Sequence, residues 1–193
     1  MNVAPEAIYD FWFGGPSRNE FGQSRKAWFA KNATLDAEIQ TRFLQTLEIA
    51  QRGELPHWLG EPKSSLCLVL LLDQFPRNMF RDTPRAFATD AAALDVARFA
   101  VAQGYDQLLP AVERIFFYLP FEHSEALDDQ ERCVALVQAL VNADASRADF
   151  LDYAQRHRAV IERFGRFPHR NQTLGRVSTA AEIEFLRQPG SSF

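Results

Sequence analysis

The sequence predicts an all-α protein of about eight antiparallel helices arranged as stacked hairpins. Apolar residues recur at helical spacing, as on the stripe of Leu35, Ile39, Phe43 and Leu47. Residues that start and end helices punctuate the chain from one end to the other. Strand-like alternation of apolar and polar residues is nearly absent. Short connections between the expected helices favour antiparallel neighbours.

The first two expected helices have recognisable starts and stops. Pro5 can occupy the first turn of a short helix, which the glycines at 14 and 15 end. Thr34 can cap a second helix, which Gly53 ends.

The third expected helix contains the apolar run LCLVLLLDQF. Ser64 or Ser65 can cap it, and Pro76 is expected to end it, because the residue before a proline disfavours helical geometry. A buried strand is the alternative for so short an apolar run. The helical surroundings favour a helix, and its apolar character on every side predicts a central position among the other helices.

The remaining helices are each marked by a capping signal or a stop signal. They are expected from Thr89 to Gly104, over residues 106–118 with Pro120 just past the end, from Ser124 or the Asp128–Asp129 pair, from the S-x-x-D signal at Ser146 to Gly165, and from the similar signal at Thr179 and Glu182.

Length and composition predict one domain over residues 1–193. The chain has 193 residues, 47% of them hydrophobic, which suffices for a sizeable core, and no linker divides it. A net charge of -4 argues against a general nucleic-acid-binding protein. Cys67 and Cys133 lie inside apolar runs and are expected to be core residues in a reducing compartment.

No segment of the sequence predicts membrane insertion. The N-terminal residues lack the basic and apolar regions of a secretory signal. The longest purely apolar run, Leu66 to Leu72, is far shorter than the roughly twenty residues that span a bilayer. A cytoplasmic location is therefore expected.

Three polar clusters stand at expected helix ends, each with a proline and aromatic residues. They are DQFPRN (73–78), FYLPFEHSE (117–125) and RFGRFPHRN (163–171). Loops on a helical scaffold are common places for function. Asp73 directly follows an apolar run, and a buried carboxylate must find a partner or take up a proton.

Two stretches that overlap these clusters carry opposite charge. Residues 156–176 contain six arginines and one acid, whereas residues 122–131 contain five acids and no lysine or arginine. In a chain near neutrality, we expect these stretches to lie together. Arg166 or Arg170 is expected to reach Asp73 or Glu122, because the planar guanidinium binds carboxylates through two bonds.

Two interpretations of the clusters are favoured, and nucleic-acid contact through residues 156–176 is a third that the acidic net charge disfavours. In the first, they form a pocket for a small anionic molecule, with the candidate ligand-binding residues Asp73, Arg77, Asn78, Glu122, His123, Glu125, Arg166, His169, Arg170 and Asn171. In the second, the cluster only fixes the packing, and the protein is a helical-hairpin scaffold for a protein or peptide partner. The scaffold predicts exposed aromatic residues around Trp12, Trp28 or Trp58.

The sequence predicts no metal and no cofactor, because the H-E-x-x-H and C-x-x-C patterns are absent and the arginines would repel a cation. His123 and Glu122 are candidates for general acid and base, a role that requires reach to a substrate. Ser124 is more simply a helix cap, and His157 is expected to be a core histidine bonded to one partner.

The motifs DFWFG, LDQFPRNMFR, ERIFFYLPFEHSE and ERFGRFPHRN resemble the uncharacterised bacterial family known as domain of unknown function 924. The resemblance runs from about residue 6 to residue 187. It implies an all-helical fold of the tetratricopeptide-like superfamily, although the repeat consensus W-x2-L-G-x2-Y is missing, and it implies no activity. The residues that it marks are Asp73, Gln74, Pro76, Arg77, Asn78, Glu122, His123, Ser124, Glu125, Phe167, Pro168, His169, Arg170 and Asn171.

Overall fold

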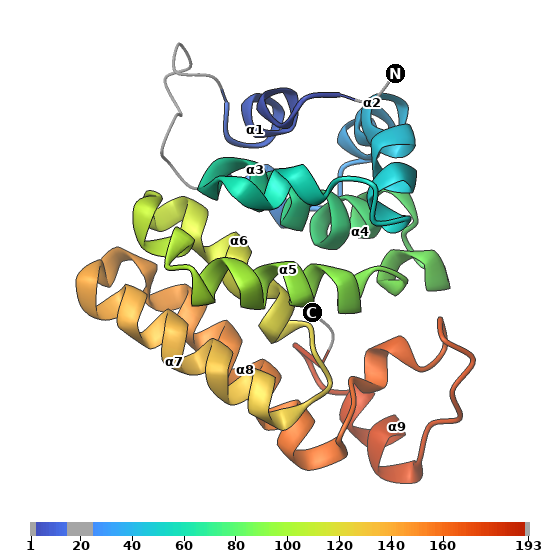
Figure 1. The fold of residues 1–193 in the computed structure, drawn as a ribbon. Coiled ribbons are helices and arrows are strands. Elements are labelled where there is room, and N and C mark those ends of the chain that lie inside the picture. Colours follow the sequence, from blue (N-terminus) through green and yellow to red (C-terminus); the bar gives the residue numbers. More distant parts are fainter. Residues whose placement is uncertain (1–2, 15–24, 192–193) are drawn as a thin grey trace. The chain divides into compact units, whose positions relative to one another are not determined.

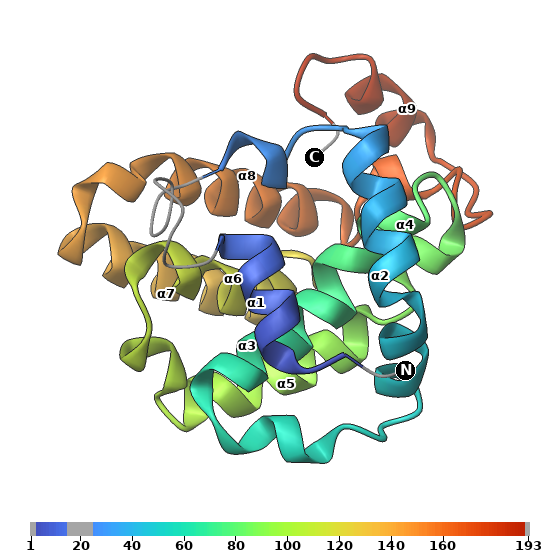
Figure 2. The same ribbon diagram turned by 90° about the horizontal axis from the view of Figure 1, so that it is seen from above.

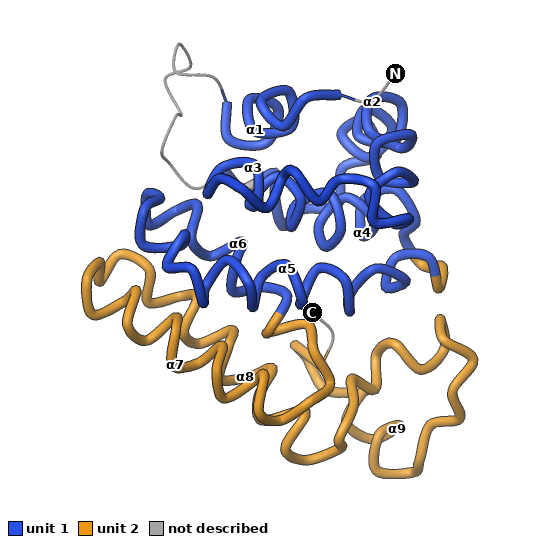
Figure 3. The backbone as a smooth tube through the Cα atoms, viewed as in Figure 1, with its two compact units in different colours: residues 1–81, 85–120 blue, residues 82–84, 121–193 orange. Residues whose placement is uncertain are grey.

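The computed structural model describes residues 3–14 and 25–191, and every regular element in them is helical (Figures 1 and 2). The predicted all-α class is confirmed. The chain divides into two compact units (Figure 3). Unit 1 comprises residues 1–81 and 85–120, and unit 2 comprises residues 82–84 and 121–193. One domain over residues 1–193 stays a prediction.

Unit 1 contains the first helices of the chain. They are α1 (Pro5–Phe13), α2 (Ala33–Gln51), α3 (Pro62–Val69), a π-helical turn (Leu70–Gln74), α4 (Phe75–Met79), α5 (Asp90–Ala102) and α6 (Ala111–Glu122). Short 3-10 turns cover Lys26–Trp28, Pro56–Gly60, Pro84–Phe87 and Tyr105–Leu108. The boundary between the units falls near the end of α6, after Pro120.

The apolar run in α3 is the central helix that the sequence predicts. Residues 65–76 are all buried and all lie in helical elements, so the strand alternative is wrong. The expected stop before Pro76 is also wrong, because the chain stays helical through a π-helical turn and into α4. An α-helical turn would pair the Leu72 carbonyl with the N–H of residue 76, which proline lacks. The hydroxyl of Thr89 donates to that carbonyl at 2.5 Å.

The predicted helix end before Pro120 is also wrong. Residues 106–118 were expected to be helical with Pro120 outside, but α6 begins at Ala111 and includes Pro120. The amide of Gln130 donates to the carbonyl oxygens of Glu122 and Ser124 at 2.6 and 2.7 Å. A buried side chain from the next helix therefore satisfies backbone acceptors where α6 ends.

The tryptophans belong to the core of unit 1. Trp12, Trp28 and Trp58 are 1%, 6% and 2% exposed. The Trp12 ring packs against Phe75 and Phe116, with centroids 5.5 and 5.8 Å apart. The exposed tryptophans that the peptide scaffold predicted are therefore wrong.

Unit 2 contains α7 (Leu127–Ala143), α8 (Ala148–Phe164) and α9 (Ala180–Leu186), with 3-10 turns at Ala145–Arg147 and Pro168–Arg170. Helices α7 and α8 lie side by side as an antiparallel hairpin (Figures 1 and 2). Its core is built on Val160, Ile161 and Phe167, with Phe164 and Phe185 packed against them. Stacking of such hairpins in a tetratricopeptide-like manner stays a prediction.

Several helix ends follow the predicted chemistry. Thr179 and Glu182 form the expected capping box at α9. Gly165 ends α8 in the left-handed conformation, with φ of 66°. Asn32 rather than Thr34 caps α2, since its side chain accepts the N–H of residues 34 and 35. Among the described residues, no helix is long and apolar enough to cross a membrane.

Candidate functional site

The predicted site residues are divided between the two units. Asp73, Arg77 and Asn78 lie in unit 1. The other predicted residues lie in unit 2, and they are Glu122, His123, Glu125, Arg166, His169, Arg170 and Asn171.

In unit 1, Asp73 lies in the π-helical turn and its side chain is fully buried. The amide of Gln74 donates to Asp73 Oδ2 at 2.6 Å. Arg77 Nη1 lies 3.3 Å from Asp73 Oδ1 and donates to the Asp73 backbone carbonyl at 2.7 Å. A π-helical turn is frequent at functional sites. Here it places a carboxylate among hydrogen-bond donors.

The Arg77 guanidinium is bound by a second acid. Its two terminal nitrogens donate to Asp90 at 2.8 and 3.0 Å. Burial by itself would lower the pKa of Arg77, but the charges of Asp73 and Asp90 raise it above its usual range. The Arg77 charge is therefore largely neutralised within unit 1 by two carboxylates.

Asn78 takes part in a separate structural contact. Its amide donates to Asp36 Oδ1 at 2.8 Å, and Arg81 binds the same carboxylate through two bonds of 2.6 and 2.8 Å. These bonds tie α4 to the first turn of α2.

In unit 2, Glu122 lies in a buried group with a histidine and a cysteine. Its Oε1 is 3.5 Å from His157 Nδ1, and its Oε2 is 4.0 Å from the Cys133 sulfur. His157 Nδ1 is also 2.9 Å from the Tyr153 carbonyl oxygen, which can only accept, so neutral His157 carries its proton on Nδ1. Burial lowers the pKa of His157 to about 3. Burial raises the pKa of the Cys133 thiol, so this thiol is unreactive.

Glu125 joins two stretches that are far apart in the sequence. Its carboxylate accepts two bonds from Arg176, at 2.7 and 3.0 Å, and one from the Phe167 backbone N–H at 2.8 Å. Arg176 also donates to the Phe167 carbonyl and to Asn171 Oδ1, both at 2.9 Å. The predicted proximity of the acidic and basic stretches is confirmed by this pair. Despite the cost of burial, the bonds from Arg176 hold the pKa of Glu125 below its usual range.

Arg166 has a different partner from those predicted. It binds both oxygens of Glu182, at 2.6 and 2.8 Å, and donates to the Val177 carbonyl at 2.9 Å. The bond from Arg166 lowers the pKa of Glu182 to about 2. Arg166 therefore fastens the capping box of α9 to the end of α8.

The Phe167 ring is the centre of a group of histidines and arginines. It is fully buried, and its centroid lies 5.5 Å from the His157 ring and 5.6 Å from the His169 ring. The Arg170 guanidinium carbon is 4.5 Å from the same centroid. Such stacking on a ring face favours a cation.

The electrostatic environment of His169 is positive. Its pKa is lowered to about 4, mainly by burial and also by the charges of Arg170, His123 and Arg176, while Glu125 acts in the opposite sense. His123, His169, Arg170, Glu125, Arg176 and Phe167 together form what we call the arginine–histidine site. His123 and His169 are partly exposed, and Arg170 is only 6% exposed.

Comparison with known proteins agrees with the resemblance seen in the sequence. The model of a family described as a bacterial protein of unknown function, DUF924, matches residues 8–190. The chain belongs to the DUF924 family. A solved structure of a protein of unknown function, ATU0120 from Agrobacterium tumefaciens, is 42% identical, with a TM-score of 0.82 over 94% of this chain and 96% of that chain. None of the curated proteins compared matches this DUF924 chain.

Several residues of the site in this DUF924 protein were not predicted from its sequence. Arg176 binds Glu125 in the site, and Gln130 and Glu182 bind the neighbouring polar residues Glu122 and Arg166; only the capping signal pointed to Glu182. His157 was expected to be a core histidine, and it is 5% exposed. No group of three or more His, Cys, Asp and Glu side chains among the described residues is arranged to hold a metal ion.

Proposed function

We propose that this DUF924 protein binds a small anion, a phosphate or a carboxylate, at the arginine–histidine site of unit 2. The observation that carries the proposal is the positive environment of His169, which adjoins Arg170 and Arg176 and remains partly exposed. Excess positive charge near a partly exposed side chain attracts a ligand of the opposite sign.

The chemistry of the side chains suits such a ligand. A guanidinium presents a planar fork of donors that matches the oxygens of a carboxylate or phosphate. The Arg170 guanidinium is aligned by its stacking on Phe167. Any proton transfer would fall to His123, because the carboxylate of Glu122 is buried against His157 and Cys133.

The His169 ring itself provides the test. A bound anion favours the imidazolium, so saturating inorganic phosphate should raise the pKa of His169, measured by NMR, from about 4 by roughly one unit. Arg170→Gln should abolish that rise. Arg187→Gln should preserve it, since Arg187 is exposed on α9 and pairs with Glu184. An unchanged pKa in saturating phosphate, or a full rise in Arg170→Gln, would refute the proposal.

The scaffold alternative keeps one supporting observation. Leu174, Val177 and Ile183 are 36%, 87% and 47% exposed in unit 2, and exposed apolar side chains suit a protein or peptide partner. In that case Arg170→Gln would lower stability without altering any response to phosphate or carboxylates.

Two further parts of the proposal concern the whole chain. The ligand-binding role of Asp73, Arg77 and Asn78 in unit 1 stays a prediction. We also propose a cytoplasmic location, in keeping with the buried free thiols of Cys67 and Cys133.

A further inference from the structure

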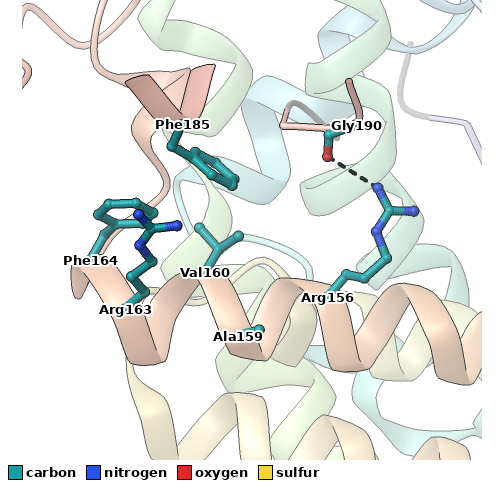
Figure 4. Close-up of a pocket in the computed structure, with 7 residues that line it drawn as sticks. All are labelled: Arg156, Ala159, Val160, Arg163, Phe164, Phe185 and Gly190. Atoms are coloured by element: carbon teal, nitrogen blue, oxygen red, sulfur yellow. Dashed lines mark hydrogen bonds between the residues drawn. The ribbon is translucent and has the colours of Figure 1, made fainter. Parts of the chain in front are cut away.

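A second feature of unit 2 is a groove between α8 and the segment that contains α9, which we call the α8–α9 groove (Figure 4). Its volume is about 240 Å³, and its lining residues are Arg156, Ala159, Val160, Arg163, Phe164, Phe185 and Gly190. None of them belongs to the arginine–histidine site.

The floor of the groove is apolar and aromatic. Val160 is 6% exposed, and the rings of Phe164 and Phe185 are tilted with their centroids 5.1 Å apart. Phe185 faces Val160 across the groove in Figure 4. An aromatic ligand placed here can pack edge-to-face or offset against these rings, the geometry that aromatic pairs prefer.

One end of the groove is closed by a fixed arginine. Arg156 Nη2 donates to the Gly190 carbonyl at 3.1 Å (Figure 4). Gly190 has a φ of 74°, and a Cβ at this position would lie only 2.8 Å from Arg156 Nη2. Glycine therefore permits both the backbone conformation and the close approach of Arg156.

The other end of the groove carries Arg163, two helical turns further along α8 and so on the same face. Its guanidinium carbon lies 4.7 Å from the Phe164 centroid and 5.9 Å from the Phe185 centroid. Within the described parts of the chain, Arg163 has no acidic partner, whereas its neighbour Glu162 pairs with Arg158 at 3.6 Å. The side chain is exposed, so its donors can face a ligand.

We propose that the α8–α9 groove binds a small aryl carboxylate. The ring would lie on Val160 and Phe185, and the carboxylate would bind the guanidinium of Arg163. At about 30 Å³ for each water molecule, the volume corresponds to roughly eight water molecules, which is close to the size of one ring with a carboxylate. An inorganic anion would gain nothing from the apolar floor, and a neutral ring would leave the cation unused.

Titration with phenylacetate, followed by amide NMR and calorimetry, tests this site. Saturable binding with shifts along α8 and α9 is expected. Arg163→Gln should weaken it by about tenfold or more, since a charge-assisted bidentate pair is lost. Ala159→Phe should block it by filling the groove, and Ala159 is exposed, so the fold should tolerate the change. Benzyl alcohol, which has a ring but no charge, should bind at least tenfold more weakly.

Two control variants separate this groove from the arginine–histidine site. Arg158→Gln lies on the same helix outside the groove and should bind phenylacetate like the unaltered protein. Arg170→Gln should also retain phenylacetate binding, and Arg163→Gln should retain the phosphate response of His169. The proposal is overturned if phenylacetate does not saturate, if Arg163→Gln or Ala159→Phe binds normally, or if Arg170→Gln alone abolishes binding.

Discussion

The hydroxyl of Thr89 is expected to compensate for a helix-internal proline, and a double-mutant cycle can measure this compensation. Thr89 is 5% exposed and donates to the Leu72 carbonyl, whose α-helical donor would come from residue 76. Thr89→Val keeps the shape of the side chain but removes the donor. Leaving a buried acceptor without that bond costs about 1–3 kcal/mol, so the free energy of unfolding of unit 1 should fall by this amount.

The second arm of the cycle restores a backbone donor. Pro76→Ala supplies an N–H at residue 76, which can then serve the Leu72 carbonyl. In that background Thr89→Val should cost less than about 0.5 kcal/mol, which corresponds to a coupling of about 0.5 kcal/mol or more between the two sites. Thr89→Ser, which keeps the hydroxyl and loses only a methyl group, should cost about 0.8 kcal/mol in both backgrounds.

Tryptophan fluorescence during urea unfolding suits this measurement. All three tryptophans, at positions 12, 28 and 58, lie in unit 1, so the signal reports the unit that contains the mutations. If Thr89→Val costs the same with proline or alanine at position 76, the Thr89 hydroxyl does not replace the donor that Pro76 lacks.

Three further outcomes are expected in unit 2, each followed by hydrogen exchange in α7 and α8. Gln130→Met should lower stability by about 1–3 kcal/mol, because carbonyls at the end of α6 lose a buried donor. In the unaltered protein, stability should fall between about pH 4.5 and pH 2, since Arg166 keeps the folded pKa of Glu182 near 2 and the unfolded chain takes up the proton first. Glu182→Gln should abolish this pH-dependent loss. Stability should also fall between about pH 6.5 and pH 3, because buried His157 stays neutral while the same histidine of the unfolded chain is protonated. His157→Phe should abolish that loss of stability. A pH profile unchanged by either substitution would contradict the corresponding assignment.

The sequence was sufficient for features that depend on local chemistry. The capping box at Thr179, the left-handed stop at Gly165 and the central position of the apolar helix all follow from residues close together in the chain. Charge complementarity also predicted that the acidic and basic stretches meet, as Glu125 and Arg176 do.

The errors arose where a distant residue compensates for a local defect. The conformational preferences of proline predict that the helix ends before Pro76. They do not predict a hydrogen-bond donor such as the Thr89 hydroxyl, thirteen positions away, for the Leu72 carbonyl. The partner of Arg166 was mistaken for a similar reason. Several acids could satisfy a guanidinium, and only the fold decides that Glu182 lies within 2.6 Å.

Some side chains of the polar clusters donate hydrogen bonds to backbone carbonyl groups and so have a structural role, whereas others support a function. Buried carbonyl groups require donors, and Gln130 and Arg176 each donate to carbonyls near a helix end or in a loop. Folding therefore explains why these side chains are polar and where they point. The group around Phe167 has another character, because His169 and Arg170 contact that ring by stacking, and the charges of Arg170 and Arg176 help to lower the pKa of His169. Because nearby positive charge disfavours the imidazolium of His169, this group, rather than the clusters as a whole, is where a bound anion would stabilise the protein most.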